Sequence, residues 1–239
     1  LFGIHVEMNI TRYILQGLMV LTLSTTLCSA GFAEPPAEQT LKYKVDFRGH
    51  NAGELETIIK RTEDGYIVTS VSHLSLIAKA FLSNETAETV FRYVDDELVL
   101  QSGREYVTKS GKEIRNFQID HQAGQILFSE GDPLTMEPGV RLEVDNFPLA
   151  LMANGIDKAA GTKFYAVSTK RARLYQTEEP TREKVTVPAG EFDAILVQHT
   201  LPGDPTRIFK IWMRDGPQPV PLRVETGREG KLTIMELLP

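Results

Sequence analysis

Four histidines that follow the N-terminal segment are the first candidates for metal binding or acid–base chemistry: His50, His73, His121 and His199. No two of them stand in an HxH, HxxxH or HExxH arrangement, the spacings that bring two imidazoles to one face of a strand or helix. His121 follows Asp120 directly, but neighbouring residues of a strand face opposite sides, so the two cannot share a ligand. We expect surface or turn histidines and no metal ligands; a site assembled across strands is the alternative.

Motifs for nucleophilic catalysis or phosphate binding are absent from the sequence. The serines stand outside any GxSxG turn, and the glycines are scattered singly rather than gathered in a phosphate-binding loop. Glu191 and Asp193 would share one face of a strand, as the carboxylates of a two-carboxylate hydrolase could, although solvated charge beside a hairpin is the simpler explanation. The sequence therefore predicts no catalytic residue, no cofactor and no enzyme activity.

A modest basic cluster consists of Lys170, Arg171 and Arg173. It could contact an anionic headgroup or a saccharide, although runs of this kind are usually solvated faces. The formal net charge of the chain is -6. This charge argues against a general binder of nucleic acid, because contact with phosphate backbones requires basic surface.

Aromatic residues at strand positions could fill a β interior or line a cavity within it. A barrel of about eight to twelve strands can be wider than its side chains fill, and it then holds a ligand. As cavity-lining residues we single out Phe91, Phe117, Phe164 and Trp212. The indole of Trp212 is either a core group that needs one hydrogen-bond acceptor or part of a ligand wall. The wider aromatic set comprises Phe81, Phe91, Tyr93, Phe117, Phe128, Phe147, Phe164, Tyr165, Phe192 and Phe209.

Alternation of apolar and polar residues with period two predicts strands along most of the chain. The first spans 41–47, a turn follows at 50–53, and a second strand continues from Leu55. Further strands are expected at 66–72, 85–93, 97–107, 112–121, 125–129, 162–169, 172–178, 182–187, 191–200, 207–214, 220–226 and 232–238. A change of period predicts a short helix within 74–82, and Asn146 could cap another over 147–154. Residues 130–146 are expected to form a loop.

These elements predict an all-β fold class with one or two short helices. Helices are too few for βαβ units, so the strands should form an antiparallel barrel or half-barrel. No repeat or low-complexity linker divides 41–239. We therefore expect a single β-barrel-like domain over these residues.

The N-terminal segment follows the plan of an export signal. Met8 and Arg12 begin a basic region, 13–27 are apolar and free of charge, and small residues precede Ala33. We expect a signal peptide over 1–33 cleaved near Ala33, with 1–7 as upstream extension and 34–40 as a flexible leader; an uncleaved anchor is the alternative. The lone Cys28 falls in the part removed, so the mature chain would have no disulfide. The expected location is the periplasm, with no stable membrane span after cleavage.

Several landmarks align with a known family. The domain opens with Tyr43-x-Val45-x-Phe47-x-Gly49-x-x-Ala52-Gly53, carries Val187-Pro188-Ala189-Gly190-Glu191-Phe192-Asp193 near its end, and closes with Trp212-Met213 and Pro221-Leu222-Arg223-Val224-Glu225. In order and spacing these resemble the bacterial exported family catalogued as domain of unknown function thirty-one-oh-eight. The resemblance covers essentially the whole chain after Ala33. It implies a periplasmic β-barrel-like domain akin to lipocalin-type or lipoprotein-sorting-type lipid carriers, and it transfers no catalytic residue.

The motif residues have a structural explanation of their own. Pro188 fixes its backbone φ and Gly190 supplies a flexible position, so Val187 and Phe192 should flank a tight turn between two strands. Gly49 and Gly53 should bracket another turn.

Three function classes remain open. By fold analogy, the sequence favours a non-catalytic carrier or binding protein for a lipid or other apolar molecule, which predicts an internal cavity. The alternative is a structural or accessory module in envelope or polysaccharide assembly with an envelope protein partner, which predicts a packed interior and an exposed apolar patch. An unrecognised hydrolase is third, and it predicts convergent polar groups with perturbed protonation in a cleft.

Overall fold

Sixteen strands and three short helical segments make up residues 36–79, 84–145 and 147–239, which are the part that the computed structural model describes. The strands of the first half are β1 (Gln39–Phe47), β2 (His50–Arg61), β3 (Gly65–Leu74), β4 (Glu85–Val94), β5 (Glu97–Val107), β6 (Glu113–Asp120), β7 (Gln125–Phe128) and β8 (Leu134–Thr135). Those of the second half are β9 (Arg141–Val144), β10 (Lys163–Ser168), β11 (Arg171–Thr177), β12 (Thr181–Val187), β13 (Gly190–Thr200), β14 (Arg207–Arg214), β15 (Pro221–Arg228) and β16 (Lys231–Leu237). The helices are α1 (Leu76–Lys79), α2 (Leu149–Asn154) and a 3-10 turn at Asp157–Ala159.

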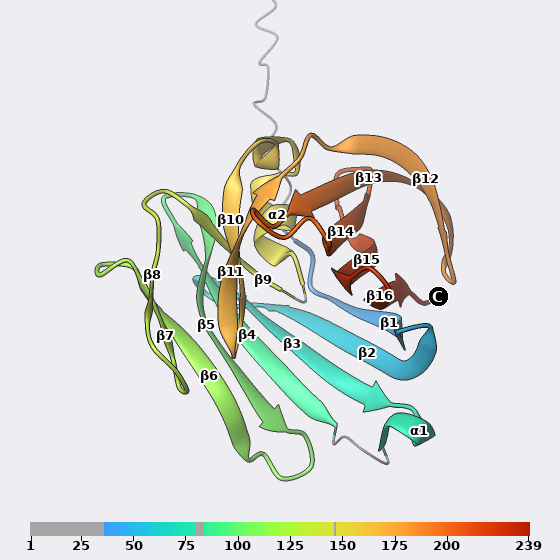
Figure 1. Cartoon of the computed structure of the whole chain (residues 1–239), viewed down its shortest axis with the longest axis horizontal. Coiled ribbons are helices and arrows are strands. Elements are labelled where there is room, and N and C mark those ends of the chain that lie inside the picture. Colours follow the sequence, from blue (N-terminus) through green and yellow to red (C-terminus); the bar gives the residue numbers. More distant parts are fainter. Residues whose placement is uncertain (1–35, 80–83, 146) are drawn as a thin grey trace, which may run out of the picture. The chain divides into compact units, whose positions relative to one another are not determined.

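All strands belong to one curled sheet (Figure 1). Its order is β8-β7-β6-β5-β4-β3-β2-β1-β16-β15-β14-β13-β11-β10-β9, with β12 added beside β13. The first eight strands therefore form a meander that the second half continues from the β1 edge. The all-β fold class and the one or two short helices that the sequence predicts are confirmed.

The sheet curls without closing by hydrogen bonds in the described residues, because its path ends at β8 on one side and β9 on the other. Helix α2 contacts both β5 and β9, and β5 also contacts β9 directly. The two arms of the sheet thus meet through side chains and a helix. This open side is where the cleft described below lies.

The prediction of a loop over 130–146 is wrong in part. The segment contains β8 and β9, and β9 pairs in parallel with β10, whereas the other strand pairs are antiparallel. A four-residue strand is too short to show a reliable period, and its partner lies beyond an intervening helix. Asn146, the expected helix cap, lies outside the described residues, as does Phe81.

The turn predicted at 50–53 is also misplaced. The hairpin turn is formed by Arg48 and Gly49, whose φ angles of 52° and 77° fit a two-residue hairpin loop, and β2 already begins at His50. Gly53 instead lies inside β2 beside a register shift of the β1–β2 pair. A Cβ at Gly53 would lie 2.1 Å from the carbonyl oxygen of His73, so the close approach of β3 requires glycine there.

The predicted turn at Pro188 is confirmed. Pro188 and Ala189 form a two-residue connection between β12 and β13, and Val187 pairs with Gly190, whose φ is 134°. The N–H of Ala189 donates to the carbonyl of Leu237 at 3.0 Å, which ties the turn to β16. Phe192 is half-buried beneath the guanidinium of Arg214, 5.2 Å from its ring centre.

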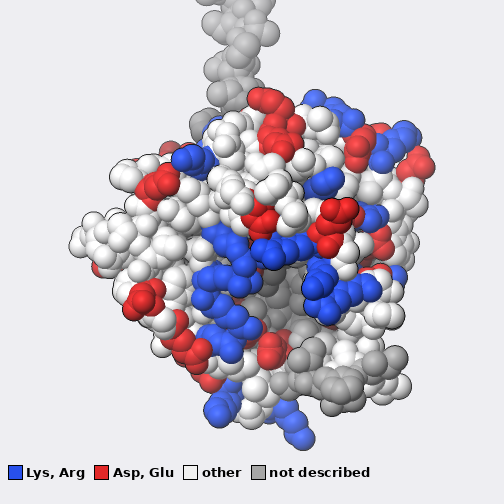
Figure 2. Space-filling model, viewed as in Figure 1, with Lys and Arg blue, Asp and Glu red and all other residues white. Residues whose placement is uncertain are grey.

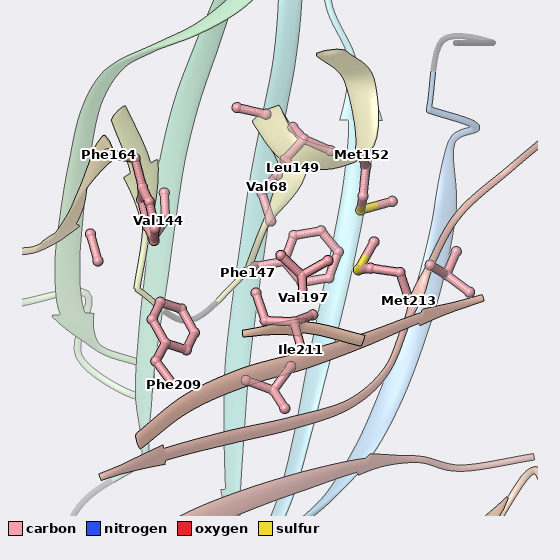
Figure 3. Packing of buried hydrophobic residues seen from close by; sticks show 14 of the residues in the cluster. Val68, Val144, Phe147, Leu149, Met152, Phe164, Val197, Phe209, Ile211 and Met213 are labelled. Atoms are coloured by element: carbon pink, nitrogen blue, oxygen red, sulfur yellow. The ribbon is translucent and has the colours of Figure 1, made fainter. Parts of the chain in front are cut away.

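Buried apolar side chains fill the inside of the curled sheet and continue beneath α2. Met152 of α2 and Met213 of β14 point toward one another, and Phe147, Val197 and Ile211 gather beside them (Figure 3). Tyr43 is fully buried, and its hydroxyl donates to the carbonyl of Pro221 at 3.1 Å. Because its Met152 packs among these buried side chains, helix α2 is part of the core.

Candidate functional site

A cleft of about 660 Å³ opens at the side where the two arms of the sheet meet. Its walls come from the start of β5, the β6–β7 turn, the segment from Thr135 to Glu143, helix α2, and β10. Its inner end is apolar and buried, formed by Leu98, Phe164, Phe209 and Ile211. A volume of this size lies within the usual range for small-molecule sites.

Hydrogen bonds from α2 hold one wall of the cleft against β5. The side chain of Asn154 accepts from the N–H of Leu98 at 2.9 Å and donates to the carbonyl of the same residue at 3.0 Å. This pair of bonds satisfies backbone groups of β5 as a neighbouring strand would. The rim is polar, and Arg141 lies 4.0 Å from Glu97 across it.

Four rings pack at the inner end of the cleft. The imidazole of His199 meets Phe164 edge-on with ring centres 4.6 Å apart and lies 4.9 Å from Phe209. Tyr175 stacks on Phe164 at 5.8 Å and meets Phe209 at 5.4 Å. Aromatic contacts of this kind add stability beyond area burial. The four rings together close the inner end of the cleft, and we call them its floor.

His199 is the polar member of this floor. Its side chain is 4% exposed, and its Nδ1 atom has no hydrogen-bond partner among the described residues. Burial lowers the pKa of His199 to about 3, so the ring is neutral at physiological pH. A buried, neutral and unsatisfied ring nitrogen is costly for the fold and available to a ligand.

Glu143 is a second buried polar group that lines the cleft. Its Oε2 accepts from the N–H of Leu151 at 2.8 Å, and its Oε1 accepts from Val144 at 3.1 Å and Ala150 at 3.4 Å. It therefore caps the first turn of α2 from β9, in the place of the side-chain cap that Pro148 cannot supply. Burial raises the pKa of Glu143 to about 8, against the opposing effect of the three N–H donors.

Of the four residues predicted to line a cavity, Phe164 lies in the cleft. Phe91 and Phe117 are buried in the sheet away from it, and Phe117 packs so closely under Gly103 that a Cβ there would lie 2.5 Å from its ring. Trp212 is 8% exposed and joins the core, and its Nε1 donates to Glu183. The structure thus does not bring these four residues to one site.

The expectation of surface or turn histidines is right for His50, His73 and His121, which are exposed, and wrong for His199. A signal for His199 was present, because it follows the buried Ile195 and Val197 at alternate positions of β13. Glu143 left no such signal, since it alternates with the buried Leu142 and Val144 and should by that pattern face solvent. Tertiary packing under α2 buries it.

The described residues contain no group of three or more His, Cys, Asp or Glu placed to hold a metal ion. Glu191 and Asp193 are exposed, and Glu191 pairs with Lys184 at 3.1 Å. Within the same residues, no helix has the length and apolar character needed to cross a bilayer.

Known proteins show little similarity in sequence to this chain. No family model matches the chain, and no curated protein matches it. One solved structure that it is similar to is a β-barrel-like protein of Domain of Unknown Function DUF1849 from Brucella abortus, at TM-score 0.49 and 9% sequence identity, covering 83% of this chain and 94% of that chain. The resemblance to the thirty-one-oh-eight family stays a prediction.

Proposed function

We propose that this protein is a non-catalytic binding or carrier protein that holds a small, mainly apolar molecule in the cleft at the open side of its sheet. One observation carries the proposal: a preformed cleft ends on packed aromatic rings that include the unsatisfied imidazole of His199. An apolar molecule would bury its surface against Leu98, Phe209 and Ile211. A hydroxyl or carbonyl on it would give the imidazole a hydrogen bond.

The other two function classes have less support. An accessory module predicts an exposed apolar patch, but the large exposed apolar side chains among the described residues are spread over four elements: Phe47, Leu76, Tyr93, Val94 and Leu127. A hydrolase predicts perturbed protonation in a cleft, which Glu143 and His199 have. Both oxygens of Glu143, however, already accept backbone N–H groups, and His199 contacts aromatic rings. These contacts favour binding over proton transfer.

The export that the N-terminal segment predicts would make the cargo a component of the cell envelope. We include the periplasmic location in the proposal. Native mass spectrometry of protein purified from its own cells tests both the export and the cargo. A mass beginning at Glu34 with a bound, solvent-extractable molecule supports the proposal.

A cleft-filling variant tests the site itself. Leu151 lies on α2 and lines the cleft, so Leu151→Trp should fill it. The control is Leu127→Trp, the same change at an exposed residue of β7. We expect the uncharged fluorescent probe N-phenyl-1-naphthylamine to bind the wild type and the control, and to bind Leu151→Trp at least tenfold more weakly. Equal binding by both variants, with circular dichroism showing both folded, would refute the cleft as the binding site.

A further inference from the structure

Three arginines lie near one another, two at the start of β11 and one at the start of β14. Alternate residues of β11 share a face, so Arg171 and Arg173 are on the same side as the buried Tyr175 and Thr177. Arg207 begins β14, and its Nε donates to the Tyr175 hydroxyl at 3.4 Å. We call Arg171, Arg173 and Arg207 the arginine cluster.

None of the three makes an ion pair within 4.0 Å among the described residues. Seven other arginines do: Arg92, Arg104, Arg115, Arg141, Arg182, Arg223 and Arg228. Burial lowers the pKa of Arg173, and the positive charges of Arg207 and Arg171 lower it further. A guanidinium nevertheless stays protonated in proteins, so the cluster holds three like charges without a direct counter-ion.

Nearby carboxylates do not neutralise the arginine cluster. Asp145 is the carboxylate within electrostatic reach of all three guanidiniums, and its single negative charge cannot balance their three positive charges. Glu105 also lies near, but it accepts a hydrogen bond from Thr169 at 2.9 Å and faces Arg115 at 3.8 Å. In Figure 2, Lys and Arg side chains gather above and on both sides of the middle of the face, with a few Asp and Glu side chains among them. The local charge is therefore positive although the net charge of the chain is -6.

We propose that Arg171, Arg173 and Arg207 form a binding site for a phosphate-type oxyanion. Guanidinium groups match the oxygens of such an anion with paired N–H donors, and a doubly charged phosphate would relieve the repulsion among them. This site would bind a charged group, whereas the cleft would bind an apolar molecule. It lies next to the cleft nonetheless, since β14 continues from Arg207 to Phe209 and β11 from Arg173 to Thr177. The anion is therefore either free phosphate or the phosphate of an amphiphilic cargo.

Calorimetric titration at constant ionic strength tests the site, with inorganic phosphate in one arm and monomeric dihexanoyl phosphatidic acid in the other. Arg173→Gln and Arg207→Gln should each weaken phosphate binding at least tenfold. The exposed Arg171→Gln should also weaken it and carries the least risk to folding. Arg61→Gln, the same charge change at an exposed residue that ends β2, should stay within twofold of the wild type.

Each outcome decides a separate point. Phosphate binding that the cluster variants weaken and Arg61→Gln does not supports the site. Phosphatidic acid binding at least tenfold tighter than phosphate, and weakened also by Leu151→Trp, makes the anion the headgroup of the cleft cargo; equal affinities indicate a free anion. No heat with either ligand, or equal losses in the cluster variants and Arg61→Gln, overturns the site. Uptake of the uncharged naphthylamine probe reports on the cleft alone, so the two proposals fail independently.

Discussion

Replacing His199 with Phe should make the protein less sensitive to acid. The fold holds this imidazole neutral, with its pKa lowered by burial from 6.5 to about 3, whereas the unfolded chain binds a proton there as the pH falls below 6.5. Stability from this residue is therefore present above pH 6.5 and is lost progressively as the pH falls toward 3. Between pH 7 and pH 5 this loss amounts to about 2 kcal/mol.

The substitution isolates this effect because the Nδ1 atom of His199 has no hydrogen-bond partner to lose. Urea unfolding at pH 7 and pH 5 measures it, since a change of 2 kcal/mol moves the midpoint by roughly 1 M for a protein of this size. The wild type should lose this amount relative to His199→Phe on going to pH 5. Other groups that titrate in the same window act on both proteins and cancel in the comparison.

Two further variants serve as controls. His199→Leu has a smaller side chain and shows whether overpacking by Phe disturbs the result. His50→Phe makes the same change at an exposed histidine and should keep the pH dependence of the wild type. If His199→Phe and the wild type lose equal stability between pH 7 and pH 5, the imidazole is not held neutral by burial and the reasoning is wrong.

Three other changes should alter stability in defined ways, each measured by urea unfolding. The wild type should lose roughly 2 to 3 kcal/mol of stability relative to Glu143→Gln from pH 5 to pH 7, since burial raises the pKa of Glu143 to about 8 and ionisation there opposes folding; a difference between the two proteins that does not vary with pH would contradict this. Gly53→Ala should cost about 3 kcal/mol or more, because its Cβ would lie 2.1 Å from a backbone oxygen of β3 at a φ of 129°; a loss below 1 kcal/mol would show that the strands separate easily. Glu183→Ala should lower the stability by about 1 kcal/mol, because it removes the acceptor of the Trp212 N–H. The control Glu179→Ala, at an exposed residue just before β12, should cause no measurable loss of stability.

Strand periodicity made most of the fold predictable. The alternation of β5 and β14 is regular enough that their predicted bounds, 97–107 and 207–214, agree with the structure. The run of β-branched residues after Tyr66 likewise marked β3. Where apolar and polar side chains alternate over seven or more residues, the local sequence is enough to predict the strand.

The cleft could not be predicted, because it depends on which strands meet across the open side of the sheet. β9 pairs in parallel with β10, which follows α2 in the chain. The four residues of β9 carry no pattern that would predict this partner. An aromatic residue at a strand position predicts Phe164, but it equally predicts Phe91 and Phe117, which face elsewhere. Periodicity tells which residues point inward, and tertiary pairing alone decides which part of the interior is filled.

The pairing of β1 with β16 has a consequence for the order in which the protein folds. These strands come from opposite ends of the described chain, and the hydroxyl of Tyr43 also reaches Pro221, 178 residues away. Contacts of such sequence separation must await synthesis of the last strand, and they slow folding because a long loop has to close first. The meander from β1 to β8 can form earlier from neighbouring hairpins, but its β1 edge stays unpaired until β16 arrives. For a chain that crosses a membrane before folding, as the N-terminal segment predicts, this delay would keep the polypeptide competent for translocation until β16 has emerged.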